Sequence, residues 1–160
     1  MVSRSVGVKG GVVKKTEEPG LNLGLLCYIA SRAMETRVLS ALAAAGFDDL
    51  TAAQARVFAR LAPEGSRITD LAQQSGITKQ TAGFLVDQLE RAGYVRRMPD
   101  PSDGRARLVR IAPRGRDAIR TARVVEAQVE AEWSDHLGVR STQQIRHALT
   151  RLREITDPYQ

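Results

Sequence analysis

Residues 67–110, RITDLAQQSGITKQTAGFLVDQLERAGYVRRMPDPSDGRARLVR, decide the fold of this chain. Apolar residues recur there at helical spacing in two short stretches, and Ser75-Gly76 interrupts the pattern between them. Thr69 is placed to cap the first helix and Thr78 the second, which ends at Gly93. Two helices joined by a short turn that contains glycine predict a helix-turn-helix.

The second helix has an unusual outer face. On a wheel of about 100° per residue, the residues that turn away from the apolar stripe are Gln80, Gly83, Phe84, Asp87 and Arg91. A phenyl ring on such a face would find a contact in the thymine methyl group of a DNA major groove. Alternatively, Phe84 packs against another part of the protein and its polar neighbours are merely solvated.

The first turn of the same helix offers further candidate DNA contacts. Lys79 suits the acceptors of guanine, and Gln80 suits the paired donor and acceptor of adenine. Thr78, beside the first free backbone N–H groups of the helix, suits a phosphate.

A two-stranded ribbon with a basic tip is predicted to follow, with strands at 94–98 and 105–111 and a turn at 99–104. Its returning strand is apolar at the base and carries Arg105 and Arg107 toward the tip. Residues 91–116 hold eight arginines and two acids, an excess equal to the formal charge of the whole chain, +6. Because this excess coincides with a helix-turn-helix, phosphate binding explains it better than a solvated face does.

This combination resembles the MarR family of bacterial transcription regulators from about residue 21 to the C-terminus. The residues that carry the resemblance are the helix-turn-helix, the segment Asp100-Pro101-Ser102-Asp103-Gly104-Arg105, and the later Arg114-Gly115. It implies that the second helix reads the major groove, that Arg105 enters the minor groove, and that Asp103 helps to orient it. Gly83-Phe84 departs from the polar pair ending in Arg that many members carry, and Ala112 replaces a capping Thr.

We therefore expect a mainly α fold with a small β-wing, in which a winged helix-turn-helix is flanked by long dimerisation helices. The expected segments are a disordered basic arm (1–20), N-terminal dimerisation and scaffold helices (21–65), the winged DNA-binding unit (66–112) and C-terminal dimerisation helices (113–160). The candidate DNA contacts are Thr78, Lys79, Gln80, Thr81, Gly83, Phe84, Arg97, Asp103, Arg105 and Arg107.

Apolar stripes predict long helices at 21–45 and 113–137, and capping boxes predict shorter helices after Thr51 (with Gln54) and after Ser141 (with Gln144).

The terminal segments are more apolar than a small DNA-reading unit needs, which predicts pairing with a second copy. The resemblance implies the same homodimer. Its two-fold symmetry predicts a pseudo-palindromic operator with half-sites about 10 base pairs apart. The alternative is a monomer whose long helices pack only on themselves.

The signal that such a regulator senses is open at this point. Cys27 lies among apolar residues with no adjacent cation, which favours a structural thiol over the alternative, a thiol-based redox sensor. The resemblance implies instead a small aromatic or lipophilic acid as effector of a repressor. The candidate lining residues, which at helical spacing are more often core, are Tyr28, Arg32, Met34, Phe58 and Trp133.

Other functions find little support in the sequence. One cysteine excludes an internal disulfide, and His136 and His147 alone are weak evidence for a metal, so we expect neither a metal nor a cofactor. No apolar run reaches the about 18 residues of a membrane span and no signal peptide is evident, which predicts a soluble cytoplasmic protein without a membrane partner. No catalytic constellation is visible, and Asp48-Asp49 is typical of a turn, so no enzyme is expected. A winged helix used as a protein-interaction module remains the alternative from another class.

Overall fold

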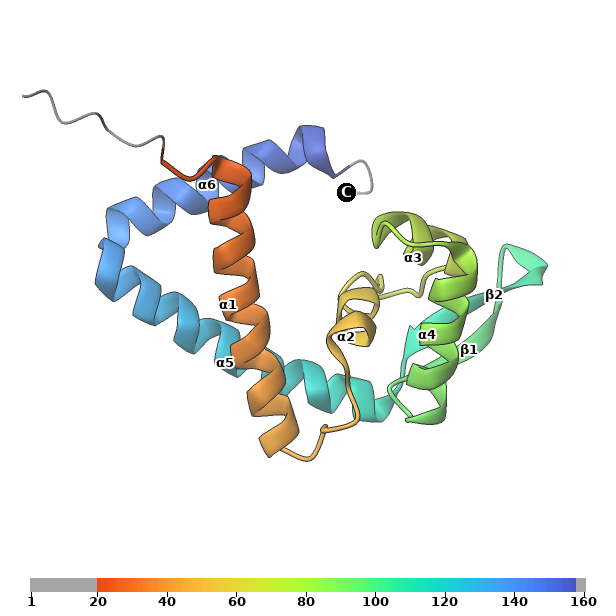
Figure 1. Ribbon diagram of the computed structural model, residues 1–160. Coiled ribbons are helices and arrows are strands. Elements are labelled where there is room, and N and C mark those ends of the chain that lie inside the picture. Colours follow the sequence, from red (N-terminus) through yellow and green to blue (C-terminus); the bar gives the residue numbers. More distant parts are fainter. Residues whose placement is uncertain (1–19, 158–160) are drawn as a thin grey trace, which may run out of the picture.

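The computed structural model describes residues 20–157, which fold into six helices and one two-stranded antiparallel sheet (Figure 1). The predicted arm lies outside the described residues, except for Gly20. The elements are α1 (Leu23–Ala44), α2 (Ala52–Phe58), α3 (Ile68–Gln74), α4 (Lys79–Arg91), β1 (Val95–Asp100), β2 (Asp103–Ile111), α5 (Pro113–Leu137) and α6 (Val139–Thr156). The expected mainly α fold with a small β-wing is confirmed.

Helices α3 and α4 form the predicted helix-turn-helix. Gly76, at φ +63°, takes the left-handed conformation that reverses the chain after α3. Thr78 caps α4 as predicted, since its Oγ1 accepts a hydrogen bond of 3.1 Å from the N–H of Thr81. The prediction for Thr69 is wrong: α3 begins after Arg67, and Thr69 lies within it and donates to Asp70.

The wing has longer strands and a tighter turn than predicted. Val95 pairs with Ile111, and the register continues regularly until Pro99 faces Arg107, after which Asp100 pairs with Asp103. The turn itself is only Pro101-Ser102. The jump in register leaves residues 104–106 as a bulge in β2, close to the tip.

The hydrophobic core lies beneath the helix-turn-helix. Its fully buried side chains include Leu71 of α3, Leu89 of α4, Tyr94 before the wing, Val57 of α2 and Val109 of β2. Leu42 at the end of α1 and Ala118 near the start of α5 belong to the same cluster. The long helices therefore share one core with the helix-turn-helix and the wing at their inner ends.

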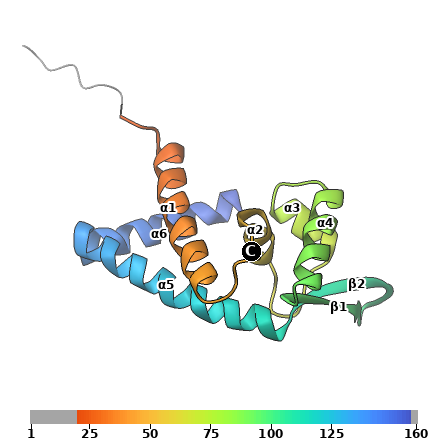
Figure 2. The ribbon, with the colours of Figure 1, turned by 60° about the horizontal axis from the view of Figure 1, so that its bottom comes forward.

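Away from this core, α1, α5 and α6 form an open frame, and the wing projects from the opposite end of the molecule (Figures 1 and 2). Arg37 of α1 joins Glu132 of α5 through two hydrogen bonds of 2.8 and 2.9 Å. Helix α6 has no buried residue among those described. None of the helices within residues 20–157 is long and apolar enough to cross a lipid bilayer.

The two predicted capping boxes have different outcomes. The Thr51 and Gln54 box is present at the start of α2. The box at Ser141 is wrong, because α6 begins two residues earlier. Gly138, at φ +83°, ends α5 and begins α6, and leaves no loop for a cap.

Candidate nucleic-acid interface

The first turn of α4 is exposed. Thr78, Lys79, Gln80 and Thr81 all lie on the surface, and the hydroxyls of Thr78 and Thr81 are 2.8 Å apart. A helix of 13 residues that begins here directs its free N–H groups and the positive end of its dipole to the same point. The turn therefore combines a cation, an amide and hydroxyls with a site suited to a phosphate oxygen.

Phe84 lies one turn further along the same face. Its side chain is 57% exposed, so Phe84 does not pack into the core of its own chain. Beside it, Gly83 has nothing within 4 Å of where a Cβ would be, which leaves open space next to the ring. The face thus offers an apolar group that a major groove could contact through thymine methyl groups.

Arg97 is held by α4. Its guanidinium pairs with Asp87 at 2.6 Å and with Glu90, and its backbone N–H donates to Glu90 at 2.7 Å. The carboxylates of Asp87 and Glu90 raise the pKa of Arg97 against an opposing effect of burial, the largest single contribution. These contacts fasten the start of the wing to α4 and offset part of the negative charge of two acids beside the outer face of that helix.

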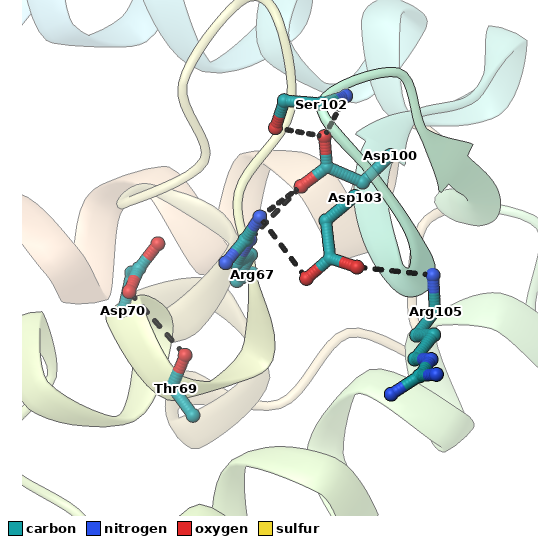
Figure 3. A network of polar contacts seen from close by, with 7 residues as sticks. All are labelled: Arg67, Thr69, Asp70, Asp100, Ser102, Asp103 and Arg105. Carbon is teal, nitrogen blue, oxygen red and sulfur yellow. Dashed lines mark hydrogen bonds and ion pairs between the residues drawn. The ribbon is translucent and has the colours of Figure 1, made fainter.

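The wing tip carries the other candidate residues. Arg105 and Arg107 are exposed. Asp103 Oδ1 accepts a hydrogen bond of 3.1 Å from the backbone N–H of Arg105, so the carboxylate holds the main chain of Arg105, and the Arg105 side chain extends away from it (Figure 3). The Asp103 carboxylate therefore contacts the backbone of Arg105 and not its guanidinium. This bond still fixes the point on the ribbon from which the Arg105 side chain extends.

The eight arginines counted in the sequence are not equivalent. Arg97 and Arg114 are ion-paired, while Arg91 and Arg116 each donate to a carbonyl oxygen at 3.2 Å. Arg110 has its Nε buried without a partner among the described residues. The exposed arginines of the ribbon are Arg96, Arg105 and Arg107.

A network at the base of the wing tip was not anticipated from the sequence (Figure 3). The buried Asp100 accepts hydrogen bonds from the N–H and hydroxyl of Ser102 at 2.8 and 2.7 Å, and from Arg67 Nε and Nη2 at 2.9 and 2.6 Å. Together, Ser102 and Arg67 lower the pKa of Asp100 to about 2. An aspartate two residues before a serine signals the turn, but no local pattern could identify Arg67.

A second network joins the reading unit to the long helices. Tyr94 donates a hydrogen bond of 2.5 Å to Asp49, and Arg114 binds the same carboxylate and lies over the Tyr94 ring at 4.5 Å from its centre. Burial and the bond to Asp49 raise the pKa of Tyr94, while Arg114 is the main cause of a lowered pKa at Asp49. Asp49 is therefore a structural acceptor rather than only a turn residue.

An apolar groove of about 1690 Å³ lies among α1, α2, α5 and α6. Three of the candidate lining residues, Met34, Phe58 and Trp133, do line this groove, and Cys27 contributes to the same wall. The other two candidates, Tyr28 and Arg32, are not among the residues that line it; Tyr28 is 61% exposed, and Arg32 pairs with Glu35. Within residues 20–157, no group of three His, Cys, Asp or Glu side chains is arranged to hold a metal ion.

Comparison with known proteins gives a consistent result. A sequence model of the MarR family matches residues 48–106, from the α1–α2 loop to the wing tip. The transcriptional activatory protein BadR of Rhodopseudomonas palustris is 30% identical over 93 residues, which are 58% of this chain and 52% of BadR. The chain therefore spans about half the length of this curated relative.

Solved structures with the same fold cover more of the chain. A MarR protein is 25% identical with a TM-score of 0.70, over 85% of this chain and 98% of its own. A Mycobacterium tuberculosis MarR family protein in complex with salicylic acid is 25% identical with a TM-score of 0.61, over 84% and 98% of the two chains. MarR of E. coli without ligand is 20% identical with a TM-score of 0.66, over the same shares.

Proposed function

We propose that this chain, a MarR-family protein by its sequence match and its fold, is a homodimeric transcription regulator that binds a pseudo-palindromic DNA operator and is released by a small ligand. Members of this family are transcription regulators and not enzymes. The proposal has three components: operator binding, dimerisation and the response to a ligand. Each rests on the residues of this chain.

The observation that carries the proposal is the pairing of an exposed reading face with an exposed cationic wing. Gln80 and Phe84 lie on the outer face of α4 and Lys79 is exposed in its first turn, and an α-helix has the diameter that a major groove accepts. Arg105 and Arg107 lie on the wing next to it, where arginines can enter a minor groove and contact phosphates. A protein-interaction module would not require the cations at this edge.

Dimerisation is supported by apolar surface that the single chain leaves uncovered. Leu26 of α1 is 49% exposed, and Ile145 and Leu149 of α6 are 48% and 45% exposed. These side chains line the apolar groove, so a second copy that covers the groove would bury them. In a monomer these apolar side chains would remain exposed to water, which is unfavourable.

The effector is proposed to be a small aromatic acid that binds in the same groove. Phe58 and Trp133 would contact its ring, and Arg123 on α5 would meet its carboxylate. The salicylic acid bound to the Mycobacterium tuberculosis relative is of this class. Such a ligand lowers DNA affinity only if it prefers a dimer whose two α4 helices are wrongly spaced.

We propose repression as the direction of regulation, because a dimer that covers a promoter excludes RNA polymerase. The curated relative is named as an activatory protein, so the position of the operator relative to the promoter decides the direction. A promoter fusion measured with and without this protein gives the answer: lower output with the protein supports repression, and higher output supports activation.

Fluorescence anisotropy tests the function, with duplex DNA from upstream of the protein's own gene, duplexes selected by the protein from a random library, and a scrambled duplex. We expect a preference of about 10³ for the selected duplex, with an affinity that falls steeply as salt rises. Arg105→Ala should weaken binding with the dimer intact. Equal weak binding to all duplexes would instead favour the protein-interaction module.

Light scattering tests the dimer separately. Leu149→Glu places a charge on the uncovered α6 face and should yield a monomer that binds DNA weakly. Arg120→Gln, on the exposed side of α5, should remain a dimer. A monomeric unaltered protein at micromolar concentration would contradict the dimer.

A further inference from the structure

Arg67 connects α3 to the wing tip although it lies outside both. It is the residue before α3, in an extended conformation, and its side chain makes no capping bond to that helix. The side chain instead reaches Asp100, 33 positions later, through two hydrogen bonds of 2.9 and 2.6 Å. Figure 3 shows its guanidinium directed at the carboxylates of the wing.

Asp100 divides its two oxygens between Arg67 and the turn. Oδ2 accepts both bonds from Arg67, while Oδ1 accepts the N–H and the hydroxyl of Ser102. The Asp100 side chain is 5% exposed, so the acceptor cannot easily turn to a new partner. The orientation of the Pro101-Ser102 turn therefore depends on where Arg67 holds the carboxylate.

The same guanidinium continues to the candidate minor-groove residue. Arg67 Nη2 lies 3.8 Å from Asp103 Oδ2, and the other oxygen of Asp103 accepts the backbone N–H of Arg105. Arg105 lies in the bulge of β2, where the regular ladder is interrupted. Side-chain contacts must therefore supply the orientation that strand pairing does not supply there.

We propose that Arg67 is a positioning residue for the wing, which holds the tip, through Asp100 and Asp103, where Arg105 enters the minor groove. The inference rests on the proposed DNA binding and names a further residue for it. Arg67 also places a positive charge 3.8 Å from the exposed Asp103, whose carboxylate would otherwise repel the phosphates. Because its partner Asp100 is only 5% exposed, we expect the loss of Arg67 to lower folding stability as well as to displace the tip.

The test compares Arg67→Gln with Arg60→Gln. The second substitution removes the same charge from an ion-paired arginine of similar exposure, 46%, two residues after α2. Affinity is measured by anisotropy on a duplex that the unaltered protein has selected. We expect Arg67→Gln to bind about tenfold more weakly, the order of one lost base-pair contact, and Arg60→Gln to bind as the unaltered protein does. The failure of the unaltered protein to select any duplex would refute the proposed function itself.

A second measurement separates positioning from a direct phosphate contact. At the base pair under the wing, G·C is compared with inosine·C, which differs only by the amino group in the minor groove. The unaltered protein should distinguish these duplexes, and Arg67→Gln should lose the distinction. If Arg67 merely contacts a phosphate, Arg67→Gln should lose the same factor of affinity for both duplexes. That result would show that the proposal is wrong.

A double-mutant cycle completes the test. Arg67→Gln should have almost no further effect once Arg105 is alanine, because the residue that it positions is absent. Additive losses would overturn the proposal. Asp100→Asn keeps an acceptor for Ser102 but loses the ion pair, so it should reproduce the effect of Arg67→Gln; binding equal to that of the unaltered protein would also overturn it.

Discussion

The guanidinium of Arg114 binds both carboxylate oxygens of Asp49, at 2.7 and 2.9 Å. It also donates to the carbonyl oxygen of Ala92, the residue that ends α4, at 2.6 Å. One side chain at the start of α5 thereby fastens the loop before α2 and the last turn of the reading helix. These contacts of Arg114 form a joint between α4 and the long helix α5.

We expect Arg114→Gln to lower the free energy of unfolding by about 1–2 kcal/mol, since charge-assisted hydrogen bonds are lost at a site that is partly screened by water. The Arg114 side chain is 34% exposed, so the full cost of a buried ion pair does not apply. Urea denaturation measures the loss. Arg120→Gln, which breaks an exposed pair within α5, should change stability by less than about 0.5 kcal/mol. If both substitutions lowered the free energy of unfolding equally, the contacts of Arg114 would contribute no more to stability than an exposed ion pair.

Gly115 is required for the contact between α5 and the core. A Cβ at this position would lie 2.2 Å from the carbonyl oxygen of Tyr94 and 3.0 Å from the Phe58 ring. Because the nearest atom belongs to the backbone, Gly115→Ala should destabilise the fold by about 1–3 kcal/mol, seen as a lower melting temperature. Gly83→Ala is the matched case, with open space around a helical glycine, and should stabilise by about 0.5–1 kcal/mol. A stabilised Gly115→Ala protein would contradict the packing described.

Asp100 makes stability depend on pH in the acid range. Its pKa in the folded chain is about 2, against about 3.9 in an unfolded chain, because Ser102 and Arg67 favour the charged form. Its contribution is present above about pH 4 and is lost as the pH falls toward 2. The stability difference between the unaltered protein and Asp100→Asn should be constant near neutral pH and shrink below about pH 4, in urea titrations. A difference that stays constant down to pH 2.5 would exclude this role.

Phe84 should act on DNA affinity and not on folding. Phe84→Ala is expected to leave stability within about 0.5 kcal/mol, because the ring is 57% exposed. If the ring contacts a thymine methyl group, replacing that thymine by uracil weakens binding of the unaltered protein by about fivefold and leaves the Phe84→Ala protein unaffected. Equal uracil effects on the two proteins would show that the methyl group has another partner.

Local chemistry was enough to predict much of the fold. Gly76 and Thr78 fixed the turn and the start of α4, because positive φ and a hydroxyl cap are properties of single residues. The exposed position of Phe84 followed from helical spacing alone. The DNA contacts assigned to these residues stay predictions.

Predictions from local chemistry were wrong where residues distant in sequence determine the helix start or the partner of a charge. Thr69 and Ser141 are suited to cap helices, but Arg67 and Gly138 stand at those helix starts. Arg97 was expected to meet DNA, and its charge is shared with two acids of α4 that approach only once the wing folds back. The functional role of Arg97 stays a proposal, with its position known.

The sequence by itself determined the helix-turn-helix, the ribbon and the excess of arginine beside them, because each depends on residues within a few positions of one another. Only the tertiary structure decided which charges are available. Asp49 meets Arg114 across 65 positions and Arg67 meets Asp100 across 33, and each pairing binds an arginine to an acid that the local sequence does not identify as its partner. Such long-range pairings depend on how the helices pack, and no local pattern encodes that.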